Sequence, residues 1–209
     1  MKNPLHYQLS EYDCGPTSLL NAISFLFERE EIPPEILRNI MLYCLDCYGP
    51  EGSAGKSGTS CTAMMFLSNW LQGLGDIGKL PISSRSLRGS DVYVGDNSLL
   101  LDALHRGGAV VVRLYYEVAH YVLFTGVKDG QILLFDPYYQ TVPFTKPDEK
   151  EALLVTDHPF SWNRSVPFSY FNRESMELYA LGEMAGREAV LLFNRNTVLT
   201  EEATIEYFI

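Results

Sequence analysis

Cys14 is the residue of this sequence with the clearest capacity for chemistry. It stands in the stretch Asp13-Cys14-Gly15-Pro16, where an amphipathic helix is predicted to begin. Unpaired N–H groups and the positive end of the helix dipole favour a thiolate at such a place, and the thiolate is the nucleophilic form of cysteine. Since free cysteines are also often buried as small apolar residues, Cys14 becomes a candidate nucleophile only if a base reaches it.

His120 is the best candidate for that base. It opens the strand-like stretch 120–126, and the run 131–135 returns from the following turn and ends at Asp136. A carboxylate beside His120 would fix the imidazole tautomer and stabilise the imidazolium, leaving the other ring nitrogen to accept the cysteine proton. For His105 and His158 we expect solvated or capping roles, and His6 belongs to an irregular leading segment with nothing nearby to orient it.

The register of this hairpin decides whether His120 and Asp136 lie on the same face of the sheet. A two-residue loop at 129–130 would send them to opposite faces. A three-residue loop at 128–130 would place Asp136 opposite Val122, with His120 on the same face and roughly 7 to 8 Å away between backbones. We therefore predict the three-residue loop, or a bulge of equal effect.

Acyl transfer also needs a hydrogen-bond donor for the developing oxyanion. Gln8 lies six residues before Cys14, so its side-chain amide and the Cys14 backbone N–H can meet in one small pocket. Most glutamines are solvated loop residues, so the prediction for Gln8 depends on the other residues of the set.

Taken together, these motifs resemble the peptidase C39-like family of the papain-like cysteine hydrolases. The stretches that carry the resemblance are Gln8, Asp13-Cys14-Gly15-Pro16-Thr17, His120-Tyr121-Val122-Leu123-Phe124-Thr125-Gly126 and Asp136-Pro137. The six-residue step from glutamine to cysteine and the sixteen-residue step from histidine to the acid both match the family pattern. The resemblance implies an oxyanion-hole glutamine, a nucleophile, a general base and an orienting acid, in this order: Gln8, Cys14, His120 and Asp136.

The resemblance implies a cysteine hydrolase of the peptidase or amidase type that cleaves an amide or thioester, without a metal or organic cofactor. Its substrate would be a peptide or another acyl donor. An acyltransferase that uses the same residues, and a peptide-binding module of the same fold without catalysis, remain the alternatives. Bacteriocin-processing members of the family belong to membrane transporters with an ATPase, whereas we expect a stand-alone protein here.

Apolar periodicity and capping residues predict the elements that position these side chains. Helices are expected over 16–27, beginning at or just after Cys14, over 34–47, from Thr59 or Ser60 through Leu71, and over 98–106. Strands are expected over 109–116, 121–127 and 131–135, with a further hairpin over 177–181 and 188–194. The run 109–112 is apolar throughout, which predicts a central strand buried on both faces.

This order of elements predicts an α+β protein with the papain-like fold. We expect a single domain over 1–209, with a helical lobe at about 1–80 that carries the nucleophile, packed on a mostly antiparallel sheet at about 92–209 that carries the histidine and the acid.

Composition excludes several other classes. Of 209 residues, 46% are apolar and 20% charged, which is enough apolar surface to fold and argues against disorder. A net charge of −10 without clustered cations argues against nucleic-acid binding. No apolar run approaches the roughly 18 to 20 residues that span a membrane, and the amino terminus does not resemble a signal peptide, so we expect a cytoplasmic protein without a membrane partner. The oligomeric state stays open.

Two other motifs resemble a zinc site and a nucleotide-binding loop, and we expect neither function. Cys44 and Cys47 form a CxxC pair, but a zinc site needs about four ligands, so packed or half-exposed thiols are favoured. The glycine-rich stretch 49–58 has Pro50 where a nucleotide-binding loop needs glycine. We expect this stretch to form a flap over the active-site cleft instead.

Overall fold

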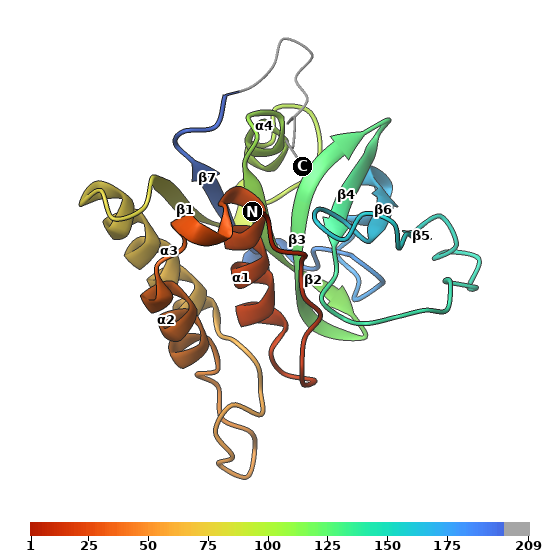
Figure 1. Cartoon of the computed structure of the whole chain (residues 1–209). Helices are drawn as coiled ribbons and strands as arrows, with labels where there is room; N and C mark the ends of the chain where they lie inside the picture. The colour runs from red at the N-terminus through yellow and green to blue at the C-terminus, as the bar shows by residue number, and fades with distance from the viewer. Residues whose placement is uncertain (199–209) are drawn as a thin grey trace.

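One antiparallel sheet of seven strands organises the part of the chain that the computed structural model describes, residues 1–198 (Figure 1). The helices are α1 (Cys14–Leu26), α2 (Pro34–Cys44), α3 (Cys61–Asp76) and α4 (Leu99–His105). The strands are β1 (Ile82–Arg88), β2 (Ala109–Tyr116), β3 (Val118–Lys128), β4 (Gln131–Phe135), β5 (Leu153–Leu154), β6 (Arg164–Pro167) and β7 (Glu188–Asn194). Short 3₁₀ helices occupy Arg29–Glu31, Gly89–Asp91, Phe168–Tyr170 and Met184–Gly186. The strand order is β1-β7-β2-β3-β4-β6-β5.

Apolar side chains cover both faces of the sheet, so β2 lies between two buried clusters. Val111 belongs to the cluster that α1, α2 and α3 fill on one face. Val112, the next residue, belongs to the cluster on the other face, which includes Leu100 of α4. The prediction that 109–112 forms a central strand buried on both faces is confirmed, and so is the α+β arrangement. Residues 199–209 of the expected sheet lobe lie outside the described residues.

The predicted helices are present, but two of their ends differ from the prediction: α2 is shorter, and α3 continues past Leu71 to Asp76. α1 begins at Cys14, and the Ser60 hydroxyl caps α3 by accepting from the Ala63 N–H at 3.0 Å. α2 ends at Cys44 rather than near 47. The reason is that the Asp46 carboxylate accepts hydrogen bonds from the backbone N–H and the hydroxyl of Ser60, which draws the chain away from the helix axis.

The predicted hairpin over 177–181 and 188–194 is wrong in its first half. Tyr179 has φ +57°, which is incompatible with an extended strand. Its segment is held to the end of β2 by single backbone hydrogen bonds, from Tyr179 N to Tyr115 O and from Tyr115 N to Ala180 O. The second half is β7, which pairs with β1 and β2 instead.

The strand β1 was not predicted because its sequence, ISSRSLR, carries few of the apolar residues that mark a strand. It lies at the edge of the sheet and pairs with β7 along its whole length.

The hairpin of β3 and β4 has the predicted register, and a β-bulge rather than a three-residue loop produces it. Its loop is the two-residue turn Asp129-Gly130, with φ of +50° and +75°, so the three-residue loop is wrong. A bulge between Phe124 and Gly126 then shifts the pairing by one residue, so that Leu123 faces Phe135. The bulge therefore has the effect that was required to bring His120 and Asp136 to one face.

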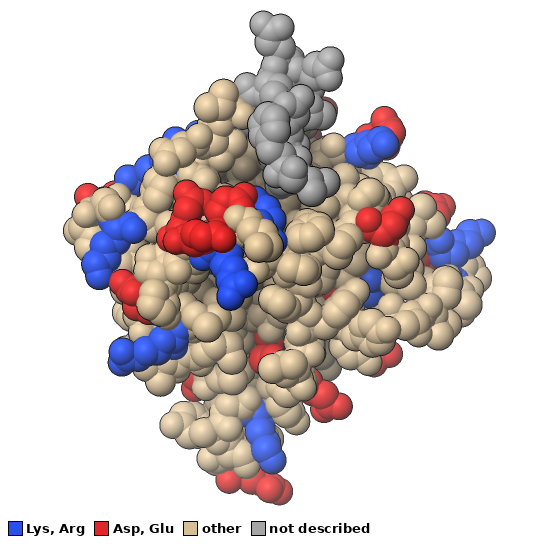
Figure 2. All heavy atoms as spheres, viewed as in Figure 1, with Lys and Arg blue, Asp and Glu red and all other residues tan. Residues whose placement is uncertain are grey.

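The surface carries both signs of charge. Acidic and basic side chains are interspersed on the face that Figure 2 shows. Within residues 1–198, no helix combines the length and the apolar character that crossing a membrane requires.

Candidate active site

Cys14 and His120 meet where α1 packs on β3. Cys14 is the first residue of α1 and 8% exposed, and His120 is 6% exposed. Both side chains line the same cavity, and Cys14 contributes to the raised pKa of His120. His120 Nε2 lies 2.7 Å from Asp136 Oδ1, which leaves Nδ1 as the ring nitrogen for the thiol. The three side chains that the sequence predicted as nucleophile, base and acid are therefore brought together.

Two close contacts fix the start of α1 against its neighbours. The Ser18 hydroxyl donates to the Tyr121 carbonyl at 3.0 Å, which ties α1 to the strand beside His120. A Cβ on Gly15 would lie 2.3 Å from the Thr59 hydroxyl oxygen, so only glycine permits this approach. Gly15 thus lets the residues before α3 pack against the first turn of the helix that carries Cys14.

The segment before Cys14 is folded around Asp13. The buried Asp13 carboxylate accepts from the backbone N–H groups of Leu9 and Ser10 and from the Ser10 hydroxyl. Burial alone would raise the pKa of Asp13, but these hydrogen bonds lower it below its ordinary value. An ionised Asp13 therefore shapes the turn that leads from Gln8 to Cys14.

His120 is held in its protonated form by its partners. Burial would lower its pKa, but the charge and hydrogen bond of Asp136, and then Cys14, raise the pKa of His120 to about 10. At neutral pH the site thus favours an imidazolium between the thiol group and the carboxylate, as an activated cysteine requires.

Asp136 has no exposed surface, and both oxygens of its carboxylate accept hydrogen bonds. Oδ1 accepts from His120 and from the Tyr138 backbone N–H at 2.8 Å, and Oδ2 accepts from the Tyr179 hydroxyl at 2.8 Å. The Asn163 side chain pairs with both the N–H and the carbonyl of Asp136. Burial would raise the pKa of Asp136, but His120, the Arg164 charge and the Tyr138 N–H hold it below its ordinary value.

Gln8 lies at the same cavity as Cys14 and His120. Its backbone N–H donates to the Pro137 carbonyl at 2.8 Å, which anchors the segment beside the acid. Its side-chain Nε2 donates to the Ser10 carbonyl at 2.8 Å, and its Oε1 is buried without a partner among the described residues. Because an amide nitrogen has two hydrogens, one N–H of Gln8 is left over in this arrangement.

An open cavity of about 540 Å³ lies over the cysteine and the histidine. Tyrosines and two glutamates line it together with the end of the glycine-rich loop: Gln8, Glu11, Tyr12, Cys14, Ser57, Gly58, Tyr116, Glu117, Val118, Ala119, His120 and Tyr138. Tyr116 and Tyr138 are aromatic residues, which more often pack in the core. Both line the cavity.

The sequence did not single out the groups behind the acid. Asn163, Arg164 and Tyr179 lie in segments without a recognisable motif, and only the fold brings them to Asp136. The other histidines lie elsewhere: His6 is exposed, His105 ends α4, and His158 stacks on Trp162 with 4.2 Å between ring centroids.

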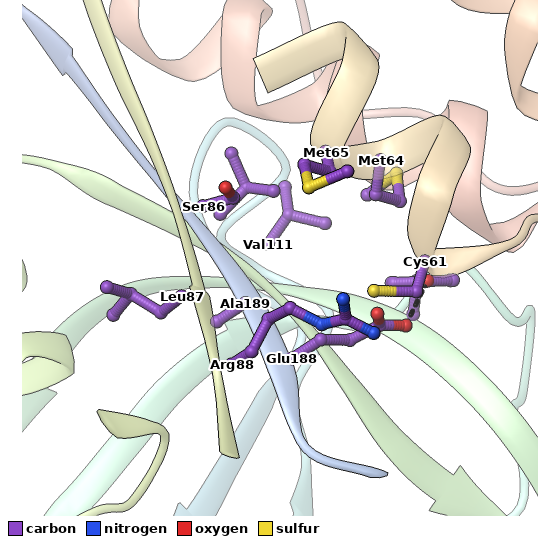
Figure 3. A pocket seen from close by; sticks show the side chains of 11 residues that line it. Cys61, Met64, Met65, Ser86, Leu87, Arg88, Val111, Glu188 and Ala189 are labelled. Atoms are coloured by element: carbon purple, nitrogen blue, oxygen red, sulfur yellow. Dashed lines mark hydrogen bonds between the residues drawn. The ribbon is translucent and has the colours of Figure 1, made fainter. Parts of the chain in front are cut away.

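A second buried polar cluster surrounds Glu188, at a small cavity of about 10 Å³ (Figure 3). The Glu188 carboxylate accepts from the Tyr121 hydroxyl at 2.5 Å, lies 3.1 Å from Arg113 Nε, and lines the small cavity together with the Cys61 thiol. Figure 3 shows the Cys61 sulfur and the Glu188 carboxylate facing the same hollow, with the Arg88 guanidinium beside them. Burial and then Glu188 raise the pKa of Cys61 to about 11, so this thiol is a poor nucleophile at neutral pH.

The remaining cysteines are protonated thiols as well. Cys44 is buried and Cys47 is partly exposed. Burial, followed by the nearby Asp46 charge, raises the pKa of both, for Cys44 to about 12. In residues 1–198, no three His, Cys, Asp or Glu side chains gather as metal ligands would.

Two solved structures are similar to this chain. One is a double glycine motif protease from an AMS/PCAT transporter in complex with the leader peptide, with a TM-score of 0.43 and 13% identity over 91% of this chain and 89% of that chain. The other is the peptidase domain of Streptococcus mutans ComA, with a TM-score of 0.40 and 14% identity over 90% of this chain and 98% of that chain. No family model and no curated protein matches the chain.

Proposed function

We propose that this protein is a cysteine hydrolase of the C39-like type, which cleaves an amide or thioester bond. The observation that carries the proposal is that His120 hydrogen-bonds the buried Asp136 and lines, together with Cys14, one open cavity. These residues come from the first turn of a helix and from a strand pair, so the scaffold holds them before a substrate arrives.

The proposed reaction begins with the Cys14 proton on His120 Nδ1, so that the Cys14 thiolate attacks the substrate carbonyl carbon, a C–S bond forms and the carbonyl π electrons move onto the oxygen. The Cys14 backbone N–H and the free Gln8 amide N–H would donate to the oxyanion. His120 then gives its proton from Nδ1 to the leaving amine or thiol, and the bond to that group breaks. Water attacks the thioester while His120 takes its proton, and the carboxylic acid and the Cys14 thiol are released. An amine in place of water would give acyl transfer.

Rapid and selective alkylation of Cys14 tests the nucleophile. We expect iodoacetamide near pH 7 to modify Cys14 at least about tenfold faster than Cys47 or Cys61, because an imidazolium faces Cys14 while burial and neighbouring carboxylates keep the other two thiols protonated. Peptide mapping by mass spectrometry gives the four rates in one sample. The partly exposed Cys47 and Cys61 serve as internal controls.

A Cys14 that reacts no faster than these controls would contradict the proposal and favour a binding module without catalysis. If the selectivity is found, incubation with a panel of peptide amides and thioesters should trap an acyl adduct on Cys14. An adduct that water removes indicates a hydrolase, and one that only an added amine removes indicates an acyltransferase.

The charge of the cavity predicts which substrates are preferred. Glu11 and Glu117 line it, whereas no lysine or arginine is among its described lining residues. We expect kcat/KM for a peptide with Lys near the scissile bond to exceed that for the matched Glu peptide by roughly five- to tenfold at low salt, because carboxylates concentrate cations near them. Combined Glu11→Gln and Glu117→Gln changes should remove most of this difference.

The matched control is a second pair of exposed glutamates away from the cavity lining, Glu174 and Glu183, changed to Gln together. This control keeps the change in net charge but not its location. A preference that falls equally in both double variants would show that total charge, rather than the cavity, selects the substrate.

A further inference from the structure

Buried polar side chains continue the hydrogen-bonded series beyond Asp136. Tyr179 is fully buried, and its hydroxyl donates to Asp136 Oδ2 at 2.8 Å, on the carboxylate oxygen that His120 does not use. Arg164 is 1% exposed, and its positive charge acts on both the Tyr179 hydroxyl and the Asp136 carboxylate. The order of groups is therefore guanidinium, phenol, carboxylate, imidazole and thiol.

The Tyr179 backbone adopts a conformation that aims its side chain. Its φ of +57° lies in the left-handed region, which residues other than glycine seldom occupy. Hydrogen bonds from Tyr179 N to Tyr115 O at 2.8 Å and from Tyr115 N to Ala180 O at 3.0 Å hold this turn against the end of β2. The position of the hydroxyl is thus set by the sheet rather than by a mobile loop.

Arg164 brings a positive charge to the acid. Its Nη1 donates to the Asn163 carbonyl at 3.0 Å and its Nη2 to the Tyr138 carbonyl at 3.3 Å, so the guanidinium is fixed by the segments on either side of Asp136. The titratable groups that act on Asp136 are His120 of β3, Arg164 of β6, Tyr179, and Tyr116 of β2. When His120 has given up its proton in the proposed reaction, Arg164 is the only cation left among these groups.

We infer, as an extension of the proposed function, that Tyr179 and Arg164 are positioning residues. Tyr179 holds the Asp136 carboxylate in the orientation that His120 requires, and Arg164 keeps that carboxylate ionised while His120 is neutral. A buried carboxylate without a nearby cation would otherwise tend to take up a proton, and a protonated acid no longer stabilises the imidazolium.

Tyr179→Phe tests the first role. We expect kcat to fall roughly 10- to 100-fold with KM within twofold, since such outer partners commonly have effects of this size. The acid limb of the kcat/KM profile should move to higher pH because the Asp136 carboxylate loses a donor. Tyr170→Phe is the matched control, since Tyr170 is 2% exposed in the same apolar cluster but does not contact Asp136. It should leave kcat and the pH profile unchanged.

Arg164→Lys and Arg164→Met together test the second role. Lysine keeps the charge and loses the planar fork, whereas methionine loses both. We expect the acid limb of Arg164→Lys to stay close to that of the wild type and the acid limb of Arg164→Met to move to higher pH. Equal profiles for the two variants would refute the role of the charge.

A readout independent of turnover separates this inference from the proposed function. The carboxyl carbon of Asp136, assigned by its loss in Asp136→Asn, can be titrated by NMR in the wild type, in Tyr179→Phe and in Tyr170→Phe. We expect the pKa of Asp136 to rise only in Tyr179→Phe. An unchanged titration overturns the inference even if the enzyme is active, and a shifted one supports it even if no substrate is found.

Discussion

Replacing Cys14 by alanine is expected to abolish turnover while leaving the fold intact. The variant removes the only atom proposed to form a bond to the substrate, so kcat/KM should fall by about 10³-fold or more. The Cys14 side chain is small and only 8% exposed, and its loss leaves a gap of about one atom. The free energy of unfolding should therefore fall by only about 1 kcal/mol. Steady-state kinetics and thermal unfolding of the same preparation check both parts.

Cys61→Ala is the matched control for this experiment. It also removes the thiol of the first residue of a helix, but that thiol faces Glu188 rather than His120. We expect activity within about twofold of the wild type for this control. Turnover that survives in Cys14→Ala, or that is lost equally in Cys61→Ala, would contradict the assignment of the nucleophile.

The sequence predicted those elements whose local pattern is strong. The apolar run at 109–112 could only be a doubly buried strand, and Pro16 and Ser60 marked the starts of helices that the structure has. β1 was missed because its burial depends on a partner, β7, that lies about a hundred residues away in the sequence. Local patterns do not report such pairings, since the serines of β1, judged with their sequence neighbours alone, do not indicate a strand.

The candidate site also combines residues that local patterns reveal with residues that only tertiary contacts reveal. Cys14, His120 and Asp136 were found because a helix start, a strand and the residue after the returning strand are local features, and one hairpin sets the distance between the last two. Arg164 and Tyr179 act only through tertiary contacts. A buried arginine and a tyrosine with positive φ have no local pattern in the sequence. The register was predicted because a shift of one residue would turn the whole strand face over.

Replacing Asp136 by alanine is expected to lower kcat by about 10³- to 10⁴-fold, the range seen when the orienting acid of a triad is lost. Without the carboxylate, His120 Nε2 has no partner to fix its orientation, and the hydroxyl of Tyr179 and the N–H of Tyr138 lose their acceptor. The pKa of His120 should fall from about 10 toward its ordinary value, because the negative charge that raises it is removed. The alkaline limb of kcat should therefore move to lower pH.

Asp136→Asn separates orientation from charge and guards against a variant that does not fold. Leaving buried donors and a buried charge without a partner can lower the free energy of unfolding by about 3–5 kcal/mol. Circular dichroism must therefore first show that the alanine variant is folded. Asparagine keeps an acceptor oxygen for His120, so we expect a smaller loss of kcat than with alanine but a similar shift of the alkaline limb. Asp102→Ala, an exposed change on α4, is the control and should alter neither. A folded Asp136→Ala variant with more than about a tenth of the wild-type kcat would show that Asp136 does not orient the base, because a lost orienting acid should cost far more.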